Sequence, residues 1–270
     1  MNRILKRGDK VSVTKEEMNL PYFKYFLKPM APVPQEKLDL LNQEPQIHVI
    51  PFEERNKFLS GEDEAEGYVQ VGFGICEDGT GFSANATYMP NVTSEMMDWW
   101  FPWHSVGSDL RYKIWDPKAH YFAQADNVAY VCDPKVPVYQ KTWGVEHYIL
   151  EDAGMGPEAL HLCFMRPKDF GYDESLIRTP QCASLVCGID KSQIAAAMTH
   201  KWYAYKKGIM FCSRFWIGYG EVDGRIVKTL PEGQQIPLAA VKGLFRHNIE
   251  EFTNLAAILP SLYQENKDNF

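Results

Sequence analysis

The stretch RHNIEEF, residues 246–252, contains a histidine and a glutamate four residues apart, His247 and Glu251. If this segment is helical, the two side chains lie one turn apart on one face, because an α-helix has 3.6 residues per turn. A helical wheel places Glu251 within the apolar arc and His247 at its edge. A buried carboxylate without a partner costs several kcal/mol or takes up a proton. Glu251 therefore requires a partner.

Two partners of Glu251 are possible on this pattern. His247 is one of them, since residues four apart on a helix touch, and a His-x-x-x-Glu spacing arises often by chance. A metal ion is the other, because imidazole together with carboxylate suits zinc or a similar divalent ion. A metal site needs further ligands from elsewhere in the chain.

Other candidate ligands lie near expected strands. In GVEHYILED, residues 144–152, the period of two places Glu151 on the more apolar face, where an acid again requires a partner. His147 shares that face and is a rival ligand. LRYKIW, residues 110–115, is expected to be a strand with Tyr112 on its apolar face, and His120 follows its end. His48, His104 and His161 are equally available, so the pattern alone does not rank the histidines.

The elements that must position these residues begin after a small N-terminal region. Residues 1–65 are rich in Lys, Glu and Pro, carry a short amphipathic segment at 34–43 and end in an acidic linker. Beyond them, an Asp-Gly turn at 77–80 predicts a hairpin between 68–76 and 81–89. Further strands are expected at 110–115, 128–132, 144–152, 159–165, 182–189, 208–222 and 225–230, and helices at 93–104, ending at Pro102, and at 192–203.

The last expected element is a long helix that opens at Ile236-Pro237 and runs to about Leu259, before Pro260. Many strands, short helices and one long C-terminal helix indicate an α+β fold, in which an antiparallel sheet is folded around that helix. Two separate α+β lobes are the alternative.

The composition excludes several classes of function. The chain has 270 residues, a net charge of −7 and a pI near 5.6, and it lacks the clustered Lys and Arg that nucleic-acid binding requires. No apolar stretch approaches the length of a membrane span. Six cysteines without a CxxC pair lie mostly in apolar runs, which is typical of reduced thiols, so we expect a cytoplasmic protein.

Three segments carry a resemblance to a known family: DWWFPWHSVGSDLRYKIWDPKAHYFA, VEHYILEDAGMG and RHNIEEFTNL. Together they resemble the 2,4-diacetylphloroglucinol hydrolase family over most of the chain. The resemblance implies a Bet v 1-like helix-grip domain at 66–270 and a small region at 1–65 that takes part in homodimer formation. It also implies zinc-dependent hydrolysis of the carbon–carbon bond between an acyl group and a phloroglucinol ring.

The resemblance also implies roles for six residues. Its two histidines and two glutamates that hold Zn²⁺ match His120, Glu151, His247 and Glu251. Its tyrosine and histidine that contact the hydroxyl or carbonyl groups of a small aromatic ketone match Tyr112 and His200. On this interpretation the C-terminal helix supplies half of a metal site.

One departure from the family concerns the acyl end of the substrate. Where the diacetylphloroglucinol enzyme has an asparagine near the acyl ketone, this chain has Ala123. We therefore expect a larger, less polar acyl group, such as the aryl-propionyl group of phloretin, which would yield phloroglucinol and 3-(4-hydroxyphenyl)propionate. The alternatives are a hydrolase of diacetylphloroglucinol or another acylphenol, and a carrier of hydrophobic ligands without activity.

Overall fold

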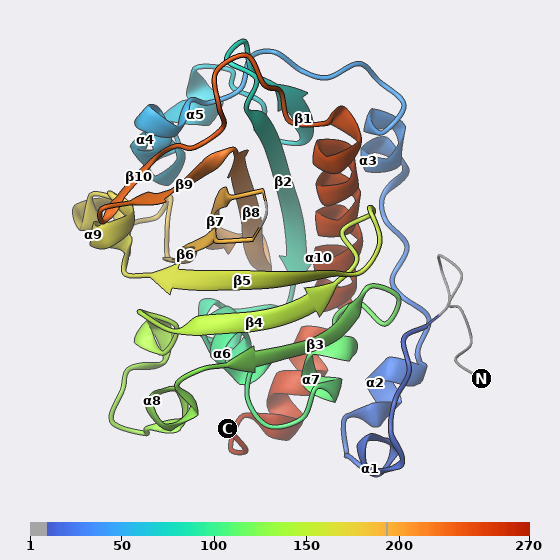
Figure 1. Ribbon diagram of the computed structural model, residues 1–270. Helices are drawn as coiled ribbons and strands as arrows, with labels where there is room; N and C mark the ends of the chain where they lie inside the picture. The colour runs from blue at the N-terminus through green and yellow to red at the C-terminus, as the bar shows by residue number, and fades with distance from the viewer. Residues whose placement is uncertain (1–9, 193) are drawn as a thin grey trace.

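The computed structural model of the protein describes residues 10–192 and 194–270. Its main feature is an eight-stranded antiparallel sheet with the order β1-β2-β8-β7-β6-β5-β4-β3 (Figure 1). The strands are β1 (Gly72–Ile75), β2 (Gly81–Pro90), β3 (His120–Ala125), β4 (Glu146–Glu151), β5 (Glu158–Met165), β6 (Ser184–Asp190), β7 (Ala196–Tyr205) and β8 (Gly208–Ile217). A separate two-stranded ribbon is made by β9 (Tyr219–Val222) and β10 (Arg225–Lys228).

Most helices are short, and the last one is long. They are α1 (Lys15–Met18), α2 (Phe23–Leu27), α3 (Gln35–Leu40), α4 (Arg55–Ser60), α5 (Glu62–Ala65), α6 (Ser94–Trp103), α7 (Leu110–Lys113), α8 (Val128–Cys132), α9 (Pro167–Phe170) and α10 (Leu238–Asn266). Three 3₁₀ turns, at Phe52–Glu54, Val138–Gln140 and Glu174–Leu176, complete the helical elements of the described residues. None of these helices is long and apolar enough to cross a membrane.

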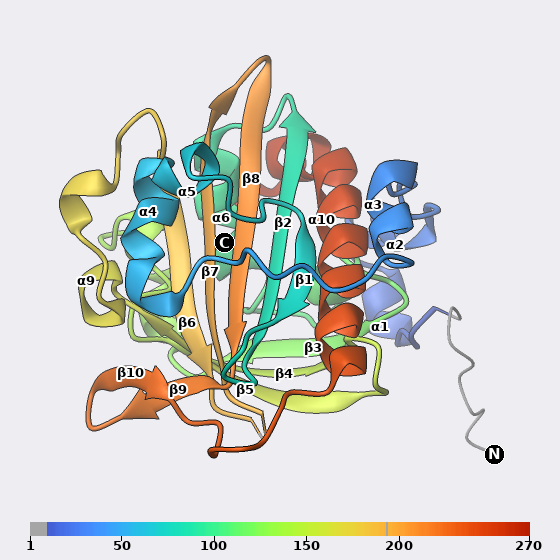
Figure 2. The same ribbon diagram turned by 90° about the horizontal axis from the view of Figure 1, so that it is seen from above.

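The sheet is strongly curved. In Figure 1, β2 runs alongside α10, whereas β5, β4 and β3 run across the lower part of the molecule at a steep angle to β2. In Figure 2, α10 lies on one side of the sheet and α4, α5 and α9 lie on the other. The long helix is thus held inside the bend of an antiparallel sheet, as the sequence predicts. All strands from β1 to β8 belong to one sheet, so the alternative of two separate lobes is wrong.

Each face of the sheet has its own hydrophobic core. In β7, Met198 and Trp202 point to the inner core with Phe245 and Phe252 of α10. Ala197 of the same strand belongs to the outer core, which is covered by α4 and α9. This alternation follows from the period of two of a strand. A polar side chain at an inner position of β3, β4 or β7 therefore faces the long helix.

The N-terminal segment packs against α7, α10 and β2. Glu17 of α1 accepts from the Lys113 ammonium of α7 at 2.7 Å, and both side chains are less than 10% exposed. Tyr25 of α2 donates to Glu265 of α10 at 3.0 Å. Lys37 of α3 donates to the Asn85 side chain of β2 at 2.7 Å. The role of residues 1–65 in forming a dimer remains a prediction.

Two segments predicted as strands are short helices instead. Residues 110–113 form α7 and are followed by a turn at 114–115, and residues 128–132 form α8. The apolar residues of the first segment recur at Leu110 and Ile114, which share a face in a helix as well as in a strand. Before α8, the Asn127 side chain accepts from the Tyr130 amide at 3.1 Å, a helix cap that the sequence analysis overlooked.

The opposite error occurs at 192–203, which was predicted as a helix. Apart from residue 193, which lies outside the described residues, this segment leads into β7, a central strand paired with β6 and β8. Pairing on both edges outweighs the helix propensity of its alanines. The helices α6 and α10 also continue through Pro102 and Pro260, where ends were predicted. The hairpin turn at 77–80 is confirmed, and α6 begins within the predicted helix, after an N-cap at Thr93.

Candidate metal centre

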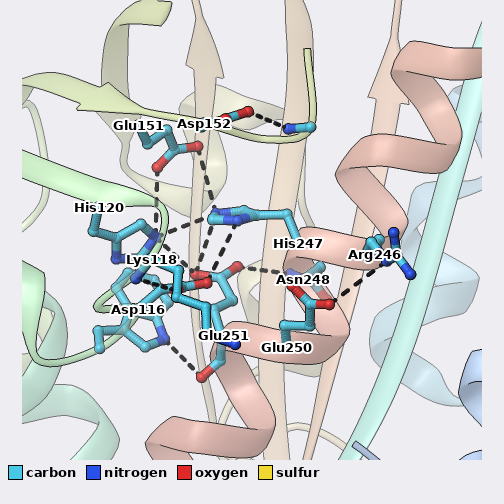
Figure 3. Close-up of polar contacts among 12 residues, drawn as sticks. Asp116, Lys118, His120, Glu151, Asp152, Arg246, His247, Asn248, Glu250 and Glu251 are labelled. Carbon is cyan, nitrogen blue, oxygen red and sulfur yellow. Dashed lines mark hydrogen bonds and ion pairs between the residues drawn. The ribbon is translucent and has the colours of Figure 1, made fainter. Parts of the chain in front are cut away.

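Three elements bring the four predicted ligands together (Figure 3). His120 opens β3 and Glu151 ends β4, and these two residues are direct partners in the antiparallel register. His247 and Glu251 lie one turn apart on α10. All four side chains are buried. The sheet and the helix each supply one histidine and one glutamate.

Three of the four donors form a tight group. His120 Nε2 lies 3.2 Å from His247 Nε2 and 3.6 Å from Glu251 Oε2, and His247 Nε2 lies 3.9 Å from the same oxygen. Nitrogen and oxygen ligands about 2.0–2.1 Å from a tetrahedral zinc ion lie about 3.3 Å from each other. The two histidines already have this spacing, and Glu251 needs to move by only a few tenths of an ångström.

Glu151 lies at the edge of this group. Its Oε2 is 3.8 Å from His120 Nε2, and its Oε1 is 3.8 Å from His247 Nε2. The Tyr112 hydroxyl donates a hydrogen bond to Oε2. Because its two oxygens face different histidines, Glu151 would have to turn its side chain to share an ion with the other three.

Neighbouring groups orient the side chains of this cluster. His120 Nδ1 lies 3.3 Å from the Tyr112 carbonyl oxygen, which can only accept, so Nδ1 carries the proton and Nε2 presents its lone pair. The Asn248 side chain donates to Glu251 Oε1 at 3.2 Å. The Trp115 indole donates to the Glu251 backbone carbonyl at 3.1 Å. Partners of this kind fix the direction of metal ligands.

The burial and charge of these side chains favour a bound cation. Burial lowers the pKa of His120 well below its usual range, and His247 lowers it further, so His120 is neutral. Burial raises the pKa of the Glu251 carboxyl well above its usual range, and Glu151 adds to this effect. A divalent ion would reverse the second shift, since it stabilises the carboxylates that burial disfavours. The donor set therefore fits a divalent metal of the zinc kind.

Three members of the cluster, Glu151, His247 and Glu251, form one wall of a mostly apolar cavity between the sheet and α10. The other walls come from β4, β5, β6, β7, β8 and α6. The apolar side chains that line the cavity are Phe101, Ile149, Leu160, Leu162, Phe164, Ala196, Met198, Phe215 and Leu244, together with Trp115 beside the cluster. A cavity of this composition suits an aromatic ligand with a few polar groups.

Tyr112 and His200 both line this cavity. The Tyr112 ring stacks on the His120 imidazole at a centroid distance of 3.9 Å, so its hydroxyl lies beside the cluster. His200 Nδ1 is 2.9 Å from the Ser213 hydroxyl, its register partner on β8. Burial lowers the pKa of His200 to about 3, which keeps its imidazole neutral. Both predicted substrate-binding residues are thus positioned to meet a ligand in the cavity.

Two further polar side chains reach the cavity: His104 of the α6 C-cap, one of the histidines that the sequence pattern does not rank, and Asp190 of β6, which the sequence pattern does not indicate. His104 Nδ1 lies 3.2 Å from the Trp100 carbonyl oxygen, and burial lowers its pKa to about 4. Burial raises the pKa of Asp190 to about 6. Asp190 ends an otherwise apolar strand sequence, which could have marked it. His147, the rival ligand, is buried beside Phe164 but lies outside the donor cluster.

Comparison with known proteins shows the family of the chain. The family model "DAPG hydrolase PhiG domain" matches residues 50–264. The chain is 62% identical over 266 residues to phloretin hydrolase from Eubacterium ramulus, covering 97% of this chain and 96% of that protein. It is 25% identical to 2,4-diacetylphloroglucinol hydrolase from Pseudomonas protegens, covering 92% and 85%. A solved Staphylococcus aureus protein of unknown function, SA2116, is 10% identical with a TM-score of 0.29, covering 70% of this chain and 91% of its own.

The matched region includes every element of the cavity described above. The protein therefore belongs to the DAPG hydrolase family. The two relatives reported above match over most of their own length, and both are named as hydrolases of an acylated phloroglucinol.

Proposed function

We propose that this protein is a zinc-dependent hydrolase that cleaves phloretin to phloroglucinol and 3-(4-hydroxyphenyl)propionate. The observation that carries the proposal is the convergence of His120, His247, Glu251 and Glu151, of which the last three line an apolar cavity. The 62% identity to a phloretin hydrolase over nearly the whole chain supports the choice of substrate. Water supplies a hydroxyl to the acyl carbon and a proton to the ring carbon.

The four clustered side chains would hold the zinc ion. When bound, zinc supplies a Lewis acid that polarises an oxygen of the substrate and makes water a better nucleophile at neutral pH. Because two glutamates offset its charge, this ion would be a milder acid than one held by three neutral histidines. Glu151, which lies outside the tight group of the other three, would be the ligand that gives way as the substrate enters.

Tyr112 and His200 would act on the substrate ring. A phloroglucinol ring is a poor leaving group if it must depart as an aryl carbanion. In the keto tautomer the departing carbon already carries a proton, so the ring can leave as a stabilised enolate. The Tyr112 hydroxyl is next to the cluster, and His200 is neutral and lines the cavity. Hydrogen bonds from these two groups to ring hydroxyls would favour the keto form and relay the proton.

The surroundings of Ala123 support a large apolar acyl group. Ala123 is buried on β3, and its register partner Ile149 lines the cavity. The apolar side chains Leu160, Leu162 and Leu244 also line the cavity. An aryl-propionyl group could bury its ring against these side chains at little desolvation cost.

Incubation of the zinc-loaded protein with phloretin tests the proposal. We expect phloroglucinol and 3-(4-hydroxyphenyl)propionate in equal amounts. Release of acetate from diacetylphloroglucinol at a higher kcat/KM would instead assign the protein to the second substrate. Binding of phloretin without any product, by a protein that holds no zinc, would support the carrier.

The proposal includes a Bet v 1-like helix-grip description of residues 66–270, a homodimer formed through residues 1–65, and a cytoplasmic location. The curved antiparallel sheet around α10 supports the first of these (Figures 1 and 2). All six cysteines are free, which suits a reducing compartment. Sedimentation of the full chain and of a chain that starts at residue 66 tests the homodimer.

A further inference from the structure

A second group of metal-ligand side chains lies on the opposite side of β4 from the cavity. Ile149 and Glu151 of β4 face the cavity, and Leu162 and Phe164 of β5 do so beside them. Because side chains alternate along a strand, Glu146 of β4 and the pair His161 and Cys163 of β5 point to the outer face. These three side chains form the outer cluster.

The register of the sheet builds the outer cluster. Glu146 and Cys163 are direct cross-strand partners, and His161 lies two residues from Cys163 on the same face. Cys163 Sγ lies 3.7 Å from His161 Nε2 and 3.6 Å from Glu146 Oε1, and His161 Nε2 lies 2.8 Å from Glu146 Oε2. Tyr148, the register partner of His161, stacks on the imidazole at 4.8 Å and holds its orientation.

These distances match the spacing of donors around a tetrahedral ion. A thiolate about 2.3 Å from zinc lies about 3.6 Å from a nitrogen or oxygen ligand of the same ion, which is the spacing observed on both sides of the sulfur. The imidazole and carboxylate must separate by about 0.5 Å to reach the spacing of about 3.3 Å between such ligands. They can do so because the side chains of His161 and Glu146 are 35% and 37% exposed.

We propose that Glu146, His161 and Cys163 bind a divalent ion of the zinc and cobalt class, with water completing its coordination. A mixed sulfur, nitrogen and oxygen set selects such borderline ions over magnesium or calcium. On binding, the thiol of Cys163 releases its proton to solvent and coordinates as the thiolate. The neighbouring Lys191 is paired with Glu221 of β9, 3.1 Å away.

A nucleophilic role for Cys163 fits the structure less well. The residue is only 7% exposed, and burial raises the pKa of its thiol to about 11, so the thiol is protonated at neutral pH. A metal ion supplies the stabilisation of the thiolate that burial withholds. An ion at this position would also tie β4 to β5, and β4 carries Glu151 to the inner cluster.

Cobalt titration of the full-length protein, freed of metal by a chelator that is then removed, tests the outer site. A thiolate bound to Co²⁺ gives a charge-transfer band in the near ultraviolet, and the donors of the inner cluster contain no sulfur, so the band reports the outer site alone. We expect a saturable band in the wild type, its loss in Cys163→Ser, and its loss or marked weakening in His161→Gln. In Cys132→Ser, which removes an exposed thiol elsewhere, the band should be unchanged.

The proposal is overturned if the wild type gives no such band at saturating cobalt, or if the band survives in Cys163→Ser or disappears in Cys132→Ser. Should Cys163→Ser fail to fold, the His161→Gln variant decides, because its thiol remains in place and an unaltered band would exclude the imidazole as a ligand. The result is independent of phloretin hydrolysis, which is measured separately.

Discussion

His120 Nε2 and His247 Nε2 face each other at 3.2 Å, although 127 residues separate them in the chain. The proton of His120 is on Nδ1, which faces the Tyr112 carbonyl oxygen, so its Nε2 offers a lone pair towards His247. With Glu251 3.6 Å away, this lone pair lies in a group of acceptors that only a cation or a shared proton stabilises. The proposed zinc site rests on this relationship.

The first prediction concerns the dependence of stability on zinc. In the wild type, free zinc at about 1,000 times its Kd should add about 4 kcal/mol to the free energy of unfolding, because the ion binds only the folded chain. Glu251→Gln keeps the volume of the side chain but loses a charged ligand of the inner site, so its melting temperature should rise much less with zinc than that of the wild type. Differential scanning calorimetry with zinc and with chelator measures both effects.

The neighbouring Glu250→Gln is the matched control. Glu250 pairs with Arg246 on the more exposed side of α10, so this variant should keep the zinc response of the wild type.

A further expectation concerns the protein without metal. Because burial and Glu151 disfavour the Glu251 carboxylate, the Glu251→Gln protein in chelator should be at least as stable as the wild type in chelator. An undiminished zinc response in Glu251→Gln would remove this residue from the metal site.

The second prediction concerns the Tyr112 hydroxyl, which donates to Glu151 beside the cluster. Tyr112→Phe keeps the ring that stacks on His120 but removes the donor. We expect kcat for phloretin to fall by about 10²-fold or more, with one zinc per inner site retained. The control is Tyr121→Phe, at the position that follows His120 on β3, which should retain the wild-type kcat. Equal kcat values for Tyr112→Phe and the wild type would show that the hydroxyl has no part in the chemistry.

The third prediction concerns the pH dependence of stability. His200 has a pKa of about 3 in the folded protein because it is buried, and about 6.5 in the unfolded chain. Between these values the unfolded state binds more protons, so stability is complete above pH 6.5 and is lost as the pH falls towards 3. The loss from this one group approaches about 1.4 kcal/mol per pH unit.

Urea unfolding at pH 7 and pH 5 tests this expectation. His200→Gln cannot take up the proton, so its free energy of unfolding should fall less between the two pH values than that of the wild type. The same variant should keep its zinc and hydrolyse phloretin slowly. If its pH dependence and its kcat both equal those of the wild type, the imidazole is neither buried in the neutral form nor involved in the reaction.

Some of this arrangement could be read from the sequence, and the reasons are local. On α10, His247 and Glu251 stand out because a charged residue interrupts an apolar arc with a period of 3.6. On β4, Glu151 stands out against the period of two. His120 carries no such signal, because its position depends on pairing with Glu151 across β3 and β4. It was found through the resemblance to the family.

The errors in the predicted elements also have physical causes. The strand β7 contains an alanine-rich sequence that favours a helix when taken alone, and only its neighbours β6 and β8 make it a strand. The segment of Tyr112 repeats its apolar residues at a spacing that suits both a strand and one turn of helix. Local patterns do not contain the pairing partners, which come from parts of the chain far away in sequence.

The fourth prediction concerns the link between the N-terminal segment and α7. Glu17→Gln leaves the Lys113 ammonium buried without its carboxylate, which should cost about 3–5 kcal/mol in the free energy of unfolding. The exposed pair of Arg166 and Glu174 is the control, and Glu174→Gln should cost less than about 1 kcal/mol. Denaturant unfolding measures both values, and equal small losses would mean that the Glu17 contact does not hold α7 in place.

The most direct measurement of the central claim is an anomalous difference map at the zinc absorption edge, from crystals of the full chain grown with zinc. Our account predicts a peak about 2.0–2.1 Å from Nε2 of both His120 and His247, within bonding distance of Glu251 and with Glu151 turned towards it. A map without a peak among these four side chains, from protein that hydrolyses phloretin, would contradict the account.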